Sequence, residues 1–162
     1  MKQDPKEQTP ILVSACLLGV NCRYDGESRP HDLLRRFAMA GRVLALCPEQ
    51  LGGLSTPRRP AEIEGGAGRE VLSNDAKILD DEGRDVTAEF IKGARQSLEL
   101  AKLTGCYRAV LKERSPSCGV TRIVSGESVL HGQGVTAALL SAEGFEIISD
   151  EYPGLQEWLD EN

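Results

Sequence analysis

The sequence predicts a single Rossmann-like α/β domain, with a mostly parallel sheet flanked by helices and a small β-hairpin insertion. Short apolar runs alternate along the chain with segments of helical periodicity, which is the order of elements in doubly wound α/β proteins. The length of 162 residues is that of one ordinary domain, and no internal repeat is visible. We therefore expect residues 11–162 to form one domain and the polar, charged residues 1–10 to be a flexible lead.

The first half of the chain predicts a βαβ unit and then a hairpin. Residues 11–15 and 43–46 are short apolar runs typical of buried strands. Between them, apolar residues repeat at helical spacing over residues 33–38, and Gly41 stands where a C-terminal cap belongs. Glycines and prolines break any long helix between residues 51 and 84. That stretch predicts a small hairpin or meander built from three β-like pieces: residues 61–64, 70–72 and 77–79.

The second half predicts helices alternating with strands. Thr87 can cap a long helix that Gly105 closes, and Gly144 ends a second helix over residues 135–143. Pro153, at a first helical position, starts a short C-terminal helix. The strands expected around these helices are residues 107–111, 122–124 and 145–149.

Three cysteines each follow an expected strand. Cys16 and Cys47 end their apolar runs, and Cys118 follows the third run after a short polar loop. Neighbouring parallel strands end roughly 4.8 Å apart, in the crevice where open α/β sheets bind ligands. Thiols converging there suit a metal cluster better than three unrelated buried cysteines, and the odd total of five cysteines argues against a disulfide framework. Cys106, directly after Gly105, fits ordinary core packing instead.

The spacing of these cysteines restricts the metal without fixing it. Structural zinc usually takes close pairs such as C-x₂-C, and ferredoxins use characteristic short spacings; neither pattern occurs. Three isolated cysteines fit a 4Fe-4S cluster whose fourth iron is open to a substrate, for which soft sulfur is a natural partner.

Polar residues beside the cysteines are candidates for catalysis and binding. Glu49 stands two residues after Cys47, where partial desolvation would suit it to general acid–base work, although a solvated loop glutamate is commoner. Ser115 precedes Cys118 by three residues, in a sequence that also suits an ordinary turn. Three arginines could reach a phosphate or carboxylate by charge and loop position: Arg58, Arg59 and Arg114.

Three motifs of the chain resemble those of the thiouracil desulfidase family. They are Ser14-Ala15-Cys16-Leu17-Leu18-Gly19 with Asn21-Cys22-Arg23-Tyr24-Asp25-Gly26, Cys47-Pro48-Glu49, and Lys112-Glu113-Arg114-Ser115-Pro116-Ser117-Cys118-Gly119. The likeness runs roughly from residue 11 to residue 149. The likeness leaves no residues for the family's frequent second domain, so we expect the short, single-domain form of a family long catalogued as a domain of unknown function.

The resemblance implies a role for each site residue. Cys16, Cys47 and Cys118 would ligate a 4Fe-4S cluster with one open iron, which would bind the sulfur of thiouracil or of a thiouridine nucleotide. Glu49 would be the acid/base and Ser115 the helper hydroxyl. The reaction would be hydrolytic and non-redox, leaving the oxo-pyrimidine and releasing hydrogen sulfide.

Two other functions remain open. The chain could be a sulfurtransferase that carries persulfide on Cys22 or Cys118, or an iron–sulfur redox sensor or carrier without catalysis. Cys22 belongs to the first motif but is not among the implied ligands, so we expect it near the site without contact to iron.

Composition limits the partners. A net charge of −6 argues against general nucleic-acid binding. No apolar stretch approaches the roughly 20 residues of a membrane span, and the N-terminus has no apolar region typical of a signal peptide. We therefore expect a cytoplasmic protein that binds a small thiopyrimidine, without a stable nucleic-acid or membrane partner.

Overall fold

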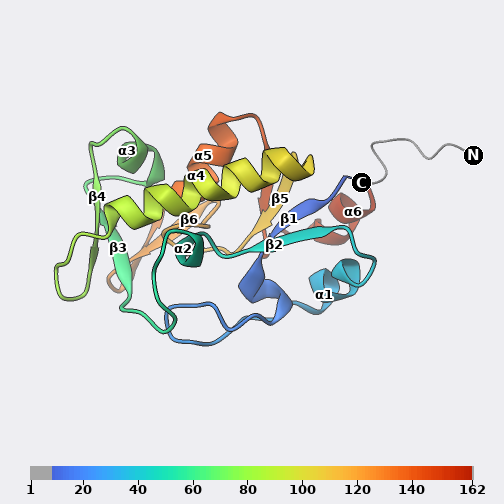
Figure 1. The fold of residues 1–162 in the computed structure, drawn as a ribbon, viewed down its shortest axis with the longest axis horizontal. Helices are drawn as coiled ribbons and strands as arrows, with labels where there is room; N and C mark the ends of the chain where they lie inside the picture. Colours follow the sequence, from blue (N-terminus) through green and yellow to red (C-terminus); the bar gives the residue numbers. More distant parts are fainter. Residues whose placement is uncertain (1–8, 162) are drawn as a thin grey trace, which may run out of the picture.

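The centre of the fold is a four-stranded parallel sheet with the strand order β2-β1-β5-β8 (Figure 1). The computed structural model describes residues 9–161; the expected flexible lead therefore falls almost wholly outside the described residues. The predicted α/β class, with a mostly parallel sheet flanked by helices, is confirmed. The strands are β1 (Ile11–Ser14), β2 (Val43–Leu46), β5 (Arg108–Leu111) and β8 (Glu146–Ser149).

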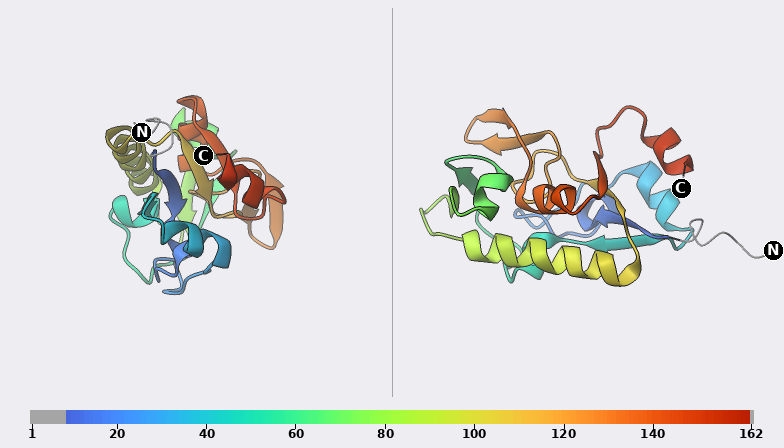
Figure 2. Two further views of the ribbon diagram at one scale, coloured as in Figure 1. Left: turned by 90° about the vertical axis from the view of Figure 1, so that its right-hand side faces the viewer. Right: turned by 90° about the horizontal axis from the view of Figure 1, so that it is seen from above.

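Alternation along the strands divides the core into two layers, because successive side chains of a strand point to opposite faces. Ile11 and Val13 of β1 belong to a cluster with α1 (Asp32–Ala38) and α6 (Leu155–Asp160). Leu12, between them, belongs to a cluster with α4 (Thr87–Thr104) and α5 (Val135–Ala142) on the other face. Figure 2 shows α4 and α6 on opposite sides of the central strands.

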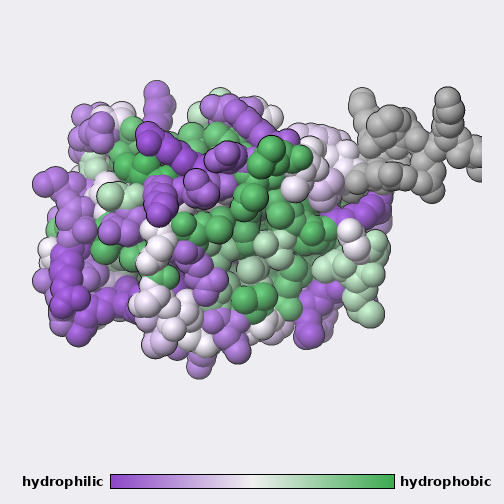
Figure 3. Space-filling view, in the orientation of Figure 1, coloured by the Kyte–Doolittle hydropathy of each residue, from purple (hydrophilic) through white to green (hydrophobic). Residues whose placement is uncertain are grey.

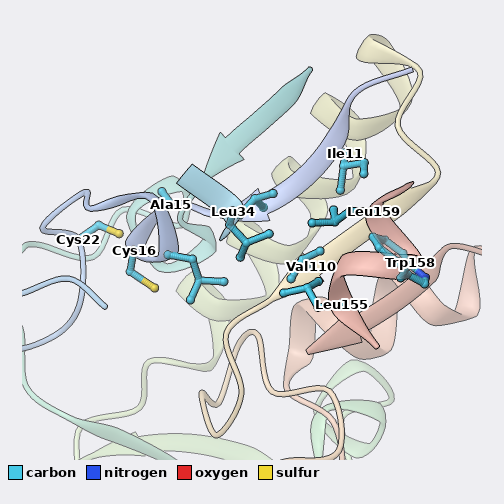
Figure 4. Close-up of a cluster of buried hydrophobic side chains, with 11 residues drawn as sticks. Ile11, Ala15, Cys16, Cys22, Leu34, Val110, Leu155, Trp158 and Leu159 are labelled. Carbon is cyan, nitrogen blue, oxygen red and sulfur yellow. The ribbon is translucent and has the colours of Figure 1, made fainter. Parts of the chain in front are cut away.

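The first of these layers reaches from the amino ends of the strands to the loops at their carboxyl ends. Figure 4 shows Trp158 of α6 at one end of this cluster and Cys16 and Cys22 at the other. Arg108 fastens the α6 end: its guanidinium lies 3.6 Å from the centre of the Trp158 ring and donates to the Trp158 carbonyl oxygen at 2.7 Å. The hydrophobic core therefore extends into the segment after β1 that carries Cys16 and Cys22, called here the first cysteine loop.

Two small antiparallel hairpins extend the molecule beyond the sheet. The predicted insertion is confirmed as β3 (Ala61–Glu64) paired with β4 (Lys77–Asp80), and β6 (Arg122–Ser125) pairs with β7 (Ser128–His131). A third core cluster, which includes Phe90 of α4, packs the insertion against α4 (Thr87–Thr104) and α5 (Val135–Ala142). No helix of the described part of the chain is long and apolar enough to cross a membrane.

The strand predicted at residues 70–72 is wrong, because these residues lie in a short helix, α3 (Gly68–Leu72). The Glu70 carboxylate accepts a hydrogen bond from the Ala67 N–H at 3.0 Å, which satisfies a free donor at the helix start. Gly68 also packs closely against α5: an added Cβ would lie 2.3 Å from the Gly134 carbonyl oxygen. A local cap and a tertiary contact outweigh the β-like composition.

Other boundaries differ by a few residues. Thr87 does not cap α4, since it is the first helical residue and its hydroxyl accepts from the Ile78 N–H; Asp85 instead accepts from the Thr87 N–H at 2.9 Å. Pro153 precedes α6, which begins at Leu155. A short helix directly after Cys47 and the strand β7 are additional to the elements that the sequence predicts.

Strand β2 is an edge of the sheet. The surface around it, on the face toward the viewer in Figure 3, is largely hydrophobic, whereas the end of the molecule with β3 and β4 is mostly hydrophilic. The carboxyl end of β2 leads directly into α2 (Pro48–Leu51), which packs on α4.

Two glycines allow α2 to approach α4. A Cβ added to Gly93 would lie 1.9 Å from the Pro48 carbonyl oxygen, and one added to Gly52 would lie 2.0 Å from the Glu89 carbonyl oxygen. Both contacts are with backbone, which cannot move aside as a flexible side chain would. Gly93 is therefore required by packing, although glycine disfavours a helix interior.

The loop after β5 is organised around the buried carboxylate of Glu113. Oε1 accepts the N–H groups of Val120, Thr121 and Arg122 at 2.8–3.0 Å, and Oε2 accepts the Thr121 hydroxyl at 2.9 Å. Burial opposes ionisation of Glu113, but these hydrogen bonds outweigh it and lower its pKa to about 2. The loop that carries Cys118 is thus closed around one charged anchor.

We predict that Gly93→Ala lowers the free energy of unfolding by about 2 kcal/mol, because overpacking exceeds the gain in helix propensity of about 1 kcal/mol. Urea unfolding measures this change. Lys92→Ala, at an exposed position of α4, is the control and should stay within about 0.5 kcal/mol of wild type. A more stable Gly93→Ala variant would contradict the close packing of α2 on α4.

We predict that Glu113→Gln lowers the free energy of unfolding by about 3 kcal/mol at pH 7, at about 1.4 kcal/mol per pKa unit. Since the folded-state pKa of Glu113 lies below the unfolded value, its contribution is complete above about pH 5 and is lost as the pH falls toward 2. Unfolding measured from pH 7 to pH 2 should show the two proteins converging. A constant difference over this range would contradict the assignment.

Candidate functional site

The three predicted ligand cysteines lie at the same edge of the sheet. Cys16 is in the 3-10 helix η2 (Ala15–Leu18) directly after β1, Cys47 immediately precedes α2 after β2, and Cys118 is in the loop after β5. Because β1 pairs with both β2 and β5, these loops leave three adjacent strands. All three cysteines line one cavity of about 360 Å³.

Cys22 lines the same cavity and lies among the other thiols. The residue is 1% exposed, and its carbonyl oxygen lies 3.7 Å from the Cys47 Sγ, which donates to it. A hydrogen bond with Cys16 raises the pKa of Cys22 to about 11. The structure therefore brings a fourth cysteine to the site, as the first motif predicted.

The four thiols of the cavity are free, and the protein environment favours the protonated form of Cys22, Cys47 and Cys118. The hydrogen bond with Cys22, together with burial, raises the pKa of Cys47, and burial raises the pKa of Cys118 to about 12. Cysteine binds metals as the thiolate, so metal binding here would release protons.

The donor set fits an iron–sulfur cluster by its chemistry. Three thiols from three separate loops face one cavity, and thiolates are the usual ligands of such clusters. Within residues 9–161, no three His, Cys, Asp or Glu side chains form a group that could hold a single metal ion. Cluster ligands bind different iron atoms and need not meet at one point, so these two observations agree. Cys106 is buried elsewhere in the core, as expected.

Glu49 lies in the same cavity, in the first turn of α2. Its carboxylate is held on both oxygens: Arg58 Nε donates to Oε1 at 3.1 Å, and the Ser117 hydroxyl donates to Oε2 at 2.8 Å. The Glu49 side chain is 15% exposed. The predicted acid/base is thus a fixed, partly desolvated carboxylate rather than a solvated loop residue.

Arg58 is enclosed by the protein, with 6% of its side chain exposed. Besides Glu49, it donates to the carbonyl oxygen of Cys22 at 2.8 Å and to Ser55 and Thr56. Its donors are therefore used to join the first cysteine loop to Glu49. A phosphate would have to displace these partners.

The other two candidate arginines differ in position. Arg114 lines the cysteine cavity and forms an ion pair with Glu151. Arg59 lines a neighbouring cavity and pairs with Asp81 and Glu82 at the surface. Arg114 is thus the candidate for binding a phosphate that both lines the cavity of the cysteines and is partly exposed.

Ser115 lines the cavity, but its hydroxyl bonds to its own loop. Its Oγ accepts the N–H groups of Ser117 and Cys118 at 3.2 and 3.1 Å and lies 2.9 Å from the Ser117 Oγ. The serine that contacts Glu49 is Ser117, which the sequence pattern did not single out. Its position directly before Cys118 is the one sequence feature that could have indicated a role at the site. A serine is equally common in an ordinary turn, so this feature does not distinguish the two cases.

Comparison with known proteins agrees with this geometry. The family model of 2-thiouracil desulfurases matches residues 11–152. The chain is 45% identical over 143 residues to the uncharacterized protein YbbK of Bacillus subtilis (strain 168), covering 86% of this chain and 95% of that protein. It is also similar to the solved structure of a 4Fe-4S-dependent thiouracil desulfidase, TudS, with a TM-score of 0.82 and 42% identity over 95% of this chain and 99% of the other. The family expected from the three motifs is therefore confirmed: this chain belongs to the 2-thiouracil desulfurase family.

Proposed function

We propose that residues 11–162 form a cluster-binding domain that removes sulfur from thiouracil or a thiouridine nucleotide, leaving the oxo-pyrimidine and hydrogen sulfide. Cys16, Cys47 and Cys118 hold a 4Fe-4S cluster, Glu49 is the acid/base and Ser115 the helper hydroxyl. The observation that carries this proposal is the position of the Glu49 carboxylate in the same cavity as the three thiols. Family membership and the named activity of TudS support it.

The cluster, when bound, supplies a Lewis acid at the iron without a cysteine ligand, suited to a soft thiocarbonyl sulfur. The residues of the chain supply proton transfer. Glu49 takes one proton from a water that attacks the thiocarbonyl carbon and passes it to the sulfur. As the C–S bond breaks and the carbonyl forms, the second water proton leaves the new oxygen and reaches the sulfur by the same carboxylate. Water and the thiocarbonyl thus become a carbonyl and hydrogen sulfide, with no net redox change.

The environment of Glu49 suits this role. Arg58 and Ser117 fix both carboxylate oxygens, so that little reorientation is needed when the proton moves. The Ser115 hydroxyl lines the same cavity and lies 2.9 Å from the Ser117 hydroxyl, through which it can support Glu49.

The alternatives receive less support from the geometry. A persulfide carrier needs an accessible thiol, yet Cys22 and Cys118 are 1% and 4% exposed. A sensor or electron carrier does not require a carboxylate fixed beside the ligands. The proposal further takes the protein to be cytoplasmic and to act on a small molecule without a stable nucleic-acid partner.

We predict that Cys16→Ala, Cys47→Ala and Cys118→Ala each lose most of the iron after anaerobic reconstitution, because each removes a proposed ligand. Iron and acid-labile sulfide per chain are the measurements. Cys106→Ala is the matched control, a buried cysteine outside the cavity that should leave the iron content unchanged. Full iron content in all three ligand variants would overturn the ligand assignment.

We predict that Glu49→Gln retains the cluster but lowers kcat for sulfide release from 2-thiouracil by about 10²- to 10⁴-fold, because glutamine cannot accept or return the proton. Glu99→Gln, at an exposed position of α4, is the control. Undiminished turnover in Glu49→Gln would remove the proposed role of this residue, and turnover by iron-free wild-type protein would refute the cluster-dependent reaction.

A further inference from the structure

The hydroxyl next to the proposed acid/base belongs to Ser117. The residue is 1% exposed, and its Oγ lies 2.8 Å from Glu49 Oε2. The Ser117 carbonyl oxygen accepts the N–H groups of Thr136 and Ala137 in the first turn of α5. Both ends of this contact are therefore anchored: Ser117 on α5, and Glu49 on α2, which packs against α4.

Counting donors and acceptors gives the hydrogen bonds a direction. Ser115 Oγ already accepts two backbone N–H groups, from Ser117 and Cys118, which occupies both of its lone pairs. In its 2.9 Å contact with the Ser117 Oγ, Ser115 must then be the donor. The Ser117 Oγ has two acceptors within reach, Glu49 Oε2 at 2.8 Å and the Cys118 Sγ at 3.7 Å. Its one proton points to the nearer carboxylate oxygen, so the chain runs from Ser115 through Ser117 to Glu49.

Glu49 is held from the opposite side as well. Arg58 donates to Oε1 and is itself fixed by the Cys22 carbonyl oxygen. With one donor on each oxygen, the plane of the carboxylate is set by Arg58 and Ser117 together. Ser115 makes none of the hydrogen bonds that the structure gives to Glu49.

From these contacts we infer that Ser117 is a positioning residue that orients the Glu49 carboxylate, and that Ser115 influences Glu49 only through Ser117. This inference rests on the proposed function of Glu49, and it moves one role of the helper hydroxyl from Ser115 to its buried neighbour. Ser115 keeps its place at the wall of the cavity, with its hydroxyl bonded to its own loop and to Ser117.

The test compares Ser117→Ala and Ser117→Thr in cluster-loaded protein, with 2-thiouracil as substrate. We expect Ser117→Ala to keep its iron and its KM while kcat falls about 10- to 100-fold, as is typical when a group supporting a reactive residue is lost. Ser117→Thr keeps the hydroxyl and should recover most of kcat. Ser97→Ala, a buried serine of α4 outside the cavity, is the control.

The same change in a Glu49→Gln background separates positioning from other effects. If Ser117 acts through Glu49, Ser117→Ala should lower the residual kcat there by less than about twofold. The inference is overturned if Ser117→Ala keeps wild-type kcat, loses its iron, or lowers kcat equally in both backgrounds.

A readout without turnover distinguishes failure of this inference from failure of the proposed function. The infrared difference between wild type and Glu49→Gln isolates the Glu49 carboxylate band, and Ser117→Ala should shift that band because a hydrogen bond is lost. An unshifted band overturns the positioning role. If loaded wild-type protein releases no sulfide from 2-thiouracil, the proposed function fails, while the band still decides whether Ser117 orients Glu49.

Discussion

The parallel pairing of β1 with β2 and β5 is the constraint on which the site depends. Ser14 of β1 is in register with Leu46 of β2, so the loops with Cys16 and Cys47 start at the same level. Leu12 is in register with Ala109 of β5, which brings the loop with Cys118 to the same edge. Antiparallel pairing of any of these strands would send one cysteine to the opposite end of the sheet. The cavity thus follows from strand direction.

Each buried carboxylate around this cavity has hydrogen-bond donors beside it. Arg58 and Ser117 hold Glu49, and backbone N–H groups hold Glu113, so each carboxylate is desolvated only where donors replace water. Arg58 also links two motifs that are distant in sequence, because it bonds both Glu49 and the Cys22 carbonyl oxygen. The rigidity that such pairing confers is useful to a residue that must present a carboxylate to a substrate.

Much of the fold, and the fact that Cys16, Cys47, Cys118, Glu49 and Ser115 line one cavity, could be predicted from the chain alone. The apolar runs located the four strands, and the positions of the cysteines after them indicated one shared cavity. Local periodicity could not locate α3 or β7, since α3 depends on the Glu70 contact with Ala67 and on close packing of Gly68 against α5. Nor could it find the partners of Glu49, because Arg58 and Ser117 are 9 and 68 residues away and meet it only in the folded chain.

The central claim is that three cysteines at one sheet edge hold a cluster with one iron left for the substrate. Mössbauer spectroscopy of protein reconstituted with ⁵⁷Fe, before and after addition of 2-thiouracil, tests it most directly. The account predicts a cluster in which one iron differs from the other three and alone changes when 2-thiouracil is added. Four equivalent irons unaffected by 2-thiouracil would contradict it.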